Sequence, residues 1–403
     1  MWDDDDRAAY RLMEELGVPD IQEATVSIVP GSRDLSRILA SSILLGDIET
    51  SPQKLVRDDY ALEFLAHKPT VEVDYSVHYM ASQSRVVTLR ASPGVFFLNY
   101  AVMPEKLSFD VFNGKYFADL RTEVRLSDPN GTTVYQAGES IPVELRKDEL
   151  KSVQDKSFQL LDAVPVIPGR YTFTLLLENA VSKEFTTVER TVTVPEPGAL
   201  WMSPLVLAKK ADRSPAPSGA VPAFRAGTVQ LFPSPTNAFH QKDVIYVFAQ
   251  IQGLSPALRE SGSLEYSFFA GDQPTSTPRR KPLRDSPDGL DYLEEFSAAA
   301  FAPGTYTVRA AVLDGGGRTV GAQRDMFLVT ANPLPSAWVS TRSNAPAEAA
   351  GTRFILGTQF LNAGDLERAA AEMEAAYTLG PDVPATPPGG PPAVAHCGGR
   401  VAH

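Results

Sequence analysis

Alternating polar and apolar residues predict β-strands along most of the chain after residue 70. Between residues 116 and 127, single apolar residues alternate with charged ones. This period of two is typical of a strand with one buried face and one wet face. The stretch ends at the Asp-Pro-Asn-Gly sequence of residues 128–131, a strong turn signal, so residues 132–136 are predicted to return as the paired strand.

An internal repeat divides this β-rich part in two. Pro168-Gly169 recurs 135 residues later as Pro303-Gly304, each followed by a tyrosine and an alternating strand, and the match extends without a gap to residues 194 and 329. Turn, strand, turn and strand predict a C-terminal hairpin in each copy. Short strands without βαβ spacing favour sandwiches. Tyr171 and Tyr306 stand where the tyrosine corner of immunoglobulin-like sandwiches bonds nearby backbone.

A helical period returns near the end of the chain. A single helix pair cannot bury its own apolar face, so we expect it to cap a neighbouring domain, pair with another chain or begin an array. Its candidate partner-binding residues are Phe354, Phe360, Met373 and Tyr377. The residues that match the tetratricopeptide pattern are Leu356, Gly357, Phe360, Gly364, Ala369, Met373, Ala376 and Pro381.

Together these patterns predict a mainly β fold. It comprises two tandem immunoglobulin-like β-sandwich domains, an N-terminal mixed segment whose residues 3–16 have a helical period, and a C-terminal tetratricopeptide-like helix pair. The expected boundaries are a mixed α/β segment at 1–69, sandwiches at 70–197 and 228–332, a Pro/Ala/Ser-rich linker at 198–227, a helical hairpin at 345–383 and a disordered tail at 384–403.

Composition removes several classes of function. The net charge of −12 over 403 residues argues against a nucleic-acid footprint, which needs a local excess of Lys and Arg. No apolar stretch is long enough to predict a transmembrane helix. Cys397 is the single cysteine, so no intrachain disulfide is possible. Met1-Trp2 precedes four aspartates, a pattern unlike a signal peptide, so a cytoplasmic location stays open.

Signatures of catalysis and metal binding do not emerge from the sequence. The five histidines lack metal-ligand spacing, and neither an H-E-x-x-H nor a G-x-S-x-G sequence occurs. We therefore predict no catalytic residues, no metal and no cofactor. The adjacent carboxylates Asp58-Asp59 and Glu294-Glu295 leave a carboxylate hydrolase as a remote alternative, since glycosidase acids come from distant positions that sequence alone does not pair.

Two clusters allow two interpretations each. Residues 275–287 carry Arg279, Arg280, Lys281 and Arg284, which could meet an acidic partner or simply be solvated in a polar loop. A dense group of aromatic residues could line a sugar- or peptide-binding face or fill a sandwich core. That aromatic group comprises Phe96, Phe97, Tyr100, Phe109, Phe112, Tyr116 and Phe117.

In its order of elements the chain resembles bacterial extracytoplasmic proteins of the GWxTD-domain type. The matching segments are residues 164–194 with their Ile-Pro-Gly-Arg-Tyr core, the Met-Ser-Pro-Leu-Val-Leu-Ala sequence of residues 202–208, and the helical residues 356–381. The Gly-Trp-x-Thr-Asp motif itself does not occur. The resemblance implies a periplasmic or extracellular location and supplies no catalytic residues.

These observations predict a non-enzymatic protein-interaction or scaffold protein of the bacterial cell envelope. The sandwiches would act as spacers, and the helix pair would bind another protein. The alternative is a carbohydrate- or cell-surface-binding sandwich, in which the aromatic group would meet a glycan.

Overall fold

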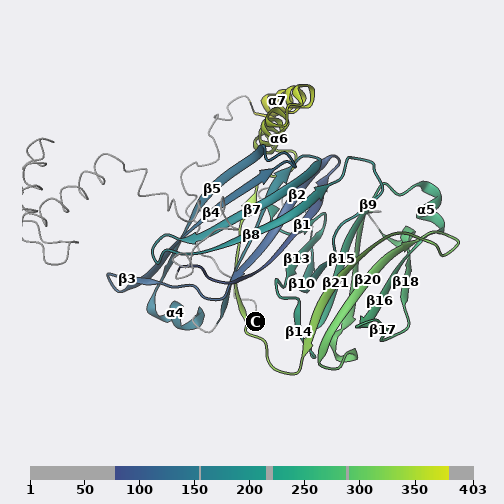
Figure 1. Ribbon diagram of the computed structural model, residues 1–403, viewed down its shortest axis with the longest axis horizontal. Coiled ribbons are helices and arrows are strands. Elements are labelled where there is room, and N and C mark those ends of the chain that lie inside the picture. The colour runs from purple at the N-terminus through teal and green to yellow at the C-terminus, as the bar shows by residue number, and fades with distance from the viewer. Residues whose placement is uncertain (1–77, 154–155, 215–220, 287–289, 381–403) are drawn as a thin grey trace, which may run out of the picture. The chain divides into compact units, whose positions relative to one another are not determined.

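A computed structural model describes residues 78–153, 156–214, 221–286 and 290–380 (Figure 1). The described chain is mainly β and forms several sheets, as the sequence predicts. The predictions for the N-terminal segment at 1–69, the tail at 384–403, the Asp58-Asp59 pair and Cys397 lie outside the described residues.

The first sandwich packs two sheets around one apolar core. One sheet contains β1 (Ser82–Ser92), β2 (Val95–Pro104), β6 (Ser157–Val166) and β22 (Ala337–Thr341), in that order. The other contains β3 (Asp110–Phe112), β4 (Lys115–Ser127), β5 (Thr133–Leu145), β7 (Gly169–Asn179) and β8 (Glu184–Val194). A short helix, α4 (Lys147–Val153), connects β5 to β6.

The second sandwich has its own core between two further sheets. The first of these sheets contains β9 (Trp201–Met202), β10 (Val206–Arg213), β12 (Arg225–Ala226), β13 (Val229–Pro233), β15 (Val244–Gln252) and β19 (Asp291–Ser297). The second contains β14 (Ala238–His240), β16 (Ser263–Ala270), β17 (Gln273–Pro274), β18 (Arg279–Pro282), β20 (Gly304–Leu313) and β21 (Thr319–Thr330). The short helix α5 (Pro256–Ser261) precedes β16.

The expected linker at 198–227 is wrong in its described part, because β9 and β10 lie within it and pair with β15. The second sandwich therefore begins well before residue 228. Phe248 packs in the first core while Val247 packs in the second, so β15 is buried on both faces. A strand buried on both faces is mostly apolar, and the two glutamines of β15, Gln250 and Gln252, are themselves buried.

The chain returns to the first sandwich after completing the second. Strand β22 pairs in parallel with β6, from Ala337 opposite Ser157 to Thr341 opposite Leu161. Its Trp338 packs against Phe158, with the ring centroids 5.1 Å apart. The first sandwich is thus built from two separated parts of the chain, a correction to the boundary drawn at residue 197.

The repeated hairpins occur as predicted. Gly169 pairs with Val194 in the first sandwich, and Gly304 pairs with Val329 in the second. Both tyrosine corners are present. The Tyr171 hydroxyl donates to the carbonyl of Pro168 at 2.9 Å, and that of Tyr306 donates to the carbonyl of Ala302 at 2.8 Å.

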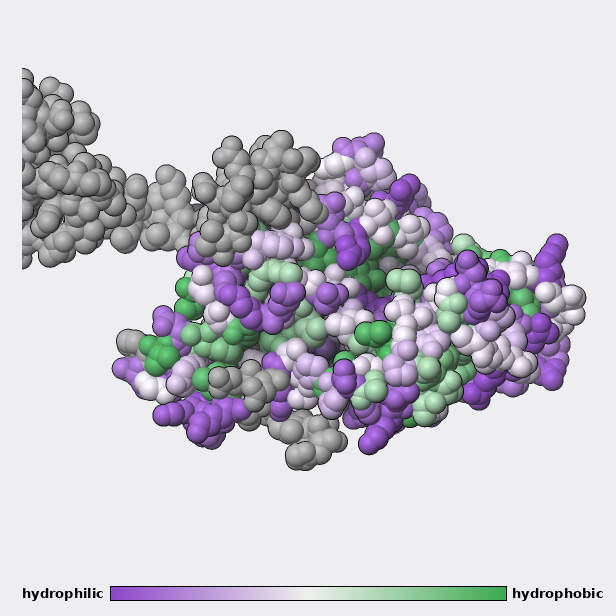
Figure 2. Space-filling model, turned by 60° about the horizontal axis from the view of Figure 1, so that its bottom comes forward, coloured by the Kyte–Doolittle hydropathy of each residue, from purple (hydrophilic) through white to green (hydrophobic). Residues whose placement is uncertain are grey.

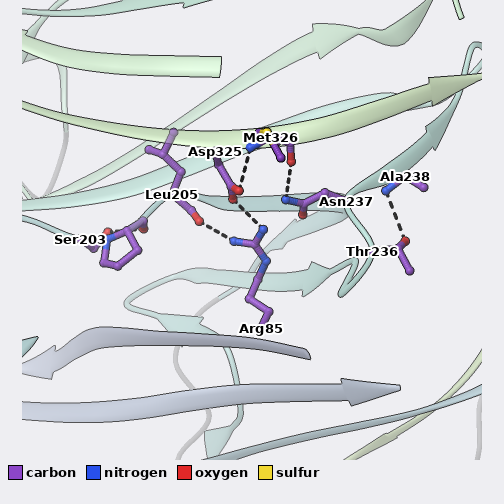
Figure 3. A network of polar contacts seen from close by, with 9 residues as sticks. Arg85, Ser203, Leu205, Thr236, Asn237, Ala238, Asp325 and Met326 are labelled. Carbon is purple, nitrogen blue, oxygen red and sulfur yellow. Dashed lines mark hydrogen bonds and ion pairs between the residues drawn. The ribbon is translucent and has the colours of Figure 1, made fainter. Parts of the chain in front are cut away.

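Polar contacts join the two sandwiches where their apolar cores meet. Arg85 on β1 donates to the carbonyl of Leu205 at 2.8 Å and to Oδ2 of Asp325 at 2.6 Å (Figure 3). A guanidinium can bridge two acceptors because its donors lie in a fixed planar fork. The side chain of Arg85 therefore ties β1 to β21 and to the segment directly before β10.

Candidate functional site: the α6–α7 helix pair

Two antiparallel helices follow β22 and form the candidate site. They are α6 (Ala350–Asn362) and α7 (Leu366–Leu379). Asp365 caps α7 by accepting the N–H of Arg368 at 3.0 Å, which satisfies one of the free donors of the first turn. A Cβ built on Gly357 would lie only 2.8 Å from Cγ of Met373, so glycine is what allows the helices to approach this closely.

The inner face of α6 belongs to the first sandwich (Figure 1). Gln359 is fully buried, donates to the carbonyl of Pro165 at 2.7 Å and accepts the N–H of Ile167 at 3.1 Å. Asn362 donates to the carbonyl of Val134 on β5 at 2.9 Å. Of the three arrangements that the sequence leaves open, the helix pair caps a neighbouring domain.

The structure separates the four candidate partner-binding residues. Phe360 is buried in the first core, and the guanidinium of Arg368 lies over its ring at 4.6 Å, so this phenylalanine is unavailable to a partner. Phe354 is half-buried, as is Met373 where it packs on Gly357. Tyr377 is 70% exposed.

A stripe of apolar residues on α7, half-buried at Met373 and exposed elsewhere, includes one that the sequence analysis does not single out. Leu366 is 68% exposed, and Ala370, Met373 and Tyr377 follow it at i+4, i+7 and i+11, the spacing of one helix face. We call Leu366, Ala370, Met373 and Tyr377 the α7 stripe. The helical spacing that places Leu366 on this face can be read from the sequence, but only the structure shows that the sandwich does not cover Leu366.

A shallow depression lies along another side of α7. It has a volume of about 670 Å³ and is lined by Glu348, Arg353, Ala371, Glu372, Glu374, Ala375, Thr378 and Leu379. Within it, Arg353 and Glu372 form an ion pair at 3.0 Å and neutralise each other. Glu348 and Glu374 form no such pair among the described residues, so their negative charges remain. The depression is therefore acidic.

A buried carboxylate sits between the sheets of the first sandwich. Asp162 on β6 accepts the Tyr100 hydroxyl at 2.5 Å and lies 3.0 Å from the guanidinium of Arg342. Burial raises the pKa of Asp162 to about 6, although hydrogen bonds from Tyr100 and the Ala163 N–H oppose the shift. Arg342 also pairs with Glu139 on β5. This cluster anchors the returning chain just before the helix pair.

The basic residues of 275–287 are engaged within the second sandwich. Arg279 and Lys281 pair with the buried Glu294, Arg279 at 3.1 Å. Arg280 pairs with Glu265 at 2.7 Å. Arg284 pairs with Glu260 at 3.2 Å. Alternate side chains of β18 thus neutralise carboxylates on different strands, so the segment is not a free basic loop. Glu294 is buried and paired, so it does not form an exposed pair of acids with Glu295.

The aromatic group is divided between the core and the surface of the first sandwich. Phe96, Phe97 and Tyr100 are buried in its core. Phe109 packs on Trp338, with the ring centroids 6.4 Å apart. Tyr116 and Phe117 are half-buried on β4, and the side chain of Phe112 lies outside the described ones. The structure therefore brings these residues together mainly as packing and does not gather them on one open face.

The histidines and helices of the described residues form neither a metal site nor a membrane span. Within residues 78–380, as far as they are described, no three His, Cys, Asp or Glu side chains gather as a metal site. His240 bonds locally, with Nδ1 accepting the N–H of Lys242 at 3.1 Å. Among the residues that the structure describes, no helix has both the length and the apolar character needed to cross a bilayer.

Comparisons with known proteins give little. No protein-family profile matches the chain, and a search of curated proteins finds no relative. Solved structures that resemble it include red sea bream transglutaminase, at 11% identity and a TM-score of 0.18 over 66% of this chain and 33% of that one. Another is the chicken interferon gamma receptor alpha chain, at 10% identity and a TM-score of 0.17 over 62% of this chain and 100% of that one. This chain thus spans about a third of the transglutaminase, and likeness at this level carries no argument about function.

Proposed function

We propose that the chain is a non-enzymatic protein-interaction protein in which two immunoglobulin-like sandwiches hold a tetratricopeptide-like helix pair for a partner. The observation that carries this proposal is the unequal use of the two helices. Gln359 and Phe360 of α6 are buried against the first sandwich, whereas Leu366 and Tyr377 of α7 remain exposed. The resemblance to GWxTD-type proteins supports a place in the bacterial cell envelope.

Exposed apolar residues scattered over a surface need no explanation, but a stripe of them does. On the face that Figure 2 presents, hydrophobic side chains form small islands among hydrophilic ones. The α7 stripe differs because Leu366 and Tyr377 are both large, both more than two-thirds exposed and aligned along one helix face. Such a face is what a helix presents to a neighbouring helix or sheet.

The test replaces stripe residues in the full chain. Deleting the helix pair would expose the first core, since Leu356 and Phe360 pack in it, so a deletion would confuse unfolding with loss of binding. We therefore compare Leu366→Ser/Tyr377→Ser with Leu379→Ser, which alters an exposed leucine on another side of the same helix.

Proteins co-purifying with each variant from the cells that produce the chain would be quantified by mass spectrometry. We expect a defined partner to be lost with Leu366→Ser/Tyr377→Ser and retained with Leu379→Ser. Equal recovery with both variants would contradict the proposal, as would a loss seen only with Leu379→Ser.

A further inference from the structure

The outer face of the second sandwich carries exposed apolar residues beside two arginines. Met326 is 64% exposed on β21, and Leu328 is exposed next to it on the same side, because Phe327 between them points into the core. Arg324 precedes Met326 by two residues and lies on the same side of β21. Arg309 on β20 stands directly opposite Arg324. We call Met326, Leu328, Arg309 and Arg324 the basic-apolar face.

The two arginines have too little negative charge around them. Like charges directly opposite on neighbouring strands are destabilising. Among the described residues no carboxylate pairs with Arg324. Arg309 forms a long ion pair with Oε1 of Glu265 at 4.0 Å, and Oε2 of the same carboxylate binds Arg280 at 2.7 Å, so one negative charge is shared by two guanidiniums. In a chain with a net charge of −12, this local positive surface is matched to an acidic partner.

The α7 stripe has the complementary character. Glu367 and Glu374 lie seven residues apart, two helical turns, along one border of the stripe. No cation among the described residues pairs with either glutamate. Leu366 and Tyr377 supply exposed apolar area beside them. A helix with this pattern fits a sheet face that offers arginines next to apolar side chains.

We propose that α7 of one copy of this chain docks on the basic-apolar face of a second copy. The inference rests on the proposed function, in which the α7 stripe is a docking surface, and it names the occupant. A second copy is favoured because the two complementary surfaces occur on the same chain. They lie on different sandwiches, so the contact joins unlike patches and leaves one free patch at each end. Such a contact builds open chains rather than closed dimers.

The test measures sedimentation of the full-length chain over a concentration series, at low and at high salt. The wild type should form species larger than a monomer as concentration rises, and high salt should weaken them, because exposed charges are screened. Glu374→Arg and Arg324→Glu each place like charges across the contact, so each alone should weaken association by about tenfold or more.

Mixing these two variants gives the sharpest outcome. The Glu374→Arg copy keeps an intact basic-apolar face, and the Arg324→Glu copy keeps an intact α7 stripe. A mixture should therefore associate, although each variant alone stays monomeric, because the intact stripe meets the intact face and the two reversed charges are opposite in sign at the second contact. Lys147→Glu, an equal charge change at an exposed site on α4, should assemble like the wild type.

Three results would overturn the inference: a wild type that stays monomeric, variants that assemble like the wild type, or a mixture that remains monomeric. Circular dichroism of each variant checks that the fold is unchanged. A monomeric wild type that still loses a partner with Leu366→Ser/Tyr377→Ser would reject the second copy while retaining α7 as a docking surface. Loss of both effects would reject the proposed function as well.

Discussion

The side-chain amide of Gln250 binds the backbone of Arg90 at both its polar groups. Oε1 accepts the Arg90 N–H at 2.6 Å, and Nε2 donates to the Arg90 carbonyl at 3.0 Å. Gln250 lies on β15 of the second sandwich and is fully buried, while Arg90 lies on β1 of the first. The amide therefore pairs with β1 much as another strand would, and it fixes the register between the sandwiches.

Replacing Gln250 with alanine should destabilise the chain by about 2–3 kcal/mol, because buried backbone groups of Arg90 would lose their partner. Chemical denaturation monitored by fluorescence measures the change. Gln252→Ala is the matched control. Gln252 is also buried, but its amide makes one long bond, to the carbonyl of Glu196 at 3.3 Å. An effect of Gln250→Ala no larger than that of Gln252→Ala would show that the paired contact is unimportant.

Both tyrosine corners should contribute measurably to stability. Tyr171→Phe and Tyr306→Phe each remove one hydroxyl that donates to a nearby carbonyl. We expect each to lower the free energy of unfolding by about 1 kcal/mol, the usual net contribution of a hydrogen bond. If the corners act independently in two sandwiches, the double variant should show the sum of the two losses in thermal or urea unfolding.

The first corner should be more sensitive to its glycine than the second. A Cβ on Gly169 would lie 2.5 Å from the Tyr171 hydroxyl oxygen, whereas a Cβ on Gly304 would lie 3.8 Å from the nearest atom of Tyr306. Gly169→Ala must therefore displace the tyrosine, and we expect it to cost about 1–3 kcal/mol more than Gly304→Ala. Equal melting temperatures for the two alanine variants would refute this steric argument.

The anchor at Asp162 should make stability depend on pH. Its pKa is raised in the folded chain to about 6, so folding takes up a proton between roughly pH 4 and 6. The stabilisation that this proton provides is complete below pH 4 and is lost as the pH rises through about 6. Asp162→Asn removes the titration, so the pH dependence of its unfolding midpoint should be flatter across this window than that of the wild type.

Removing the cation should act in the same window. Arg342→Met leaves Asp162 buried without its counter-charge, which costs about 3–5 kcal/mol when the carboxylate is ionised. At pH 5 the carboxylate is largely protonated, so the loss should be smaller there than at pH 8. The double variant with Asp162→Asn should recover part of the stability at pH 8. A loss from Arg342→Met that is equal at both pH values would exclude an electrostatic role.

Local patterns were sufficient for the parts that depend on neighbouring residues. The strand over residues 116–127 and the Pro-Gly hairpins at Tyr171 and Tyr306 follow from a period of two and from turn chemistry. The helix pair follows from a period of 3.6, with Gly357 at its closest approach. In the candidate site, Tyr377 is exposed and its role in binding a partner stays a prediction, while the helical spacing of Leu366 is present in the sequence.

Only the tertiary structure decided which surfaces meet. Sequence periodicity reports that a side chain is apolar, but it does not tell whether a core or a partner covers it. The sequence pattern therefore assigns Phe360 to a partner, although it packs in the first sandwich. The strand β10 was hidden in a Pro-rich stretch, and β22 joins a sheet through pairing with β6, which lies about 180 residues earlier in the chain. Contacts at such separations depend on the whole fold, since no local pattern determines them.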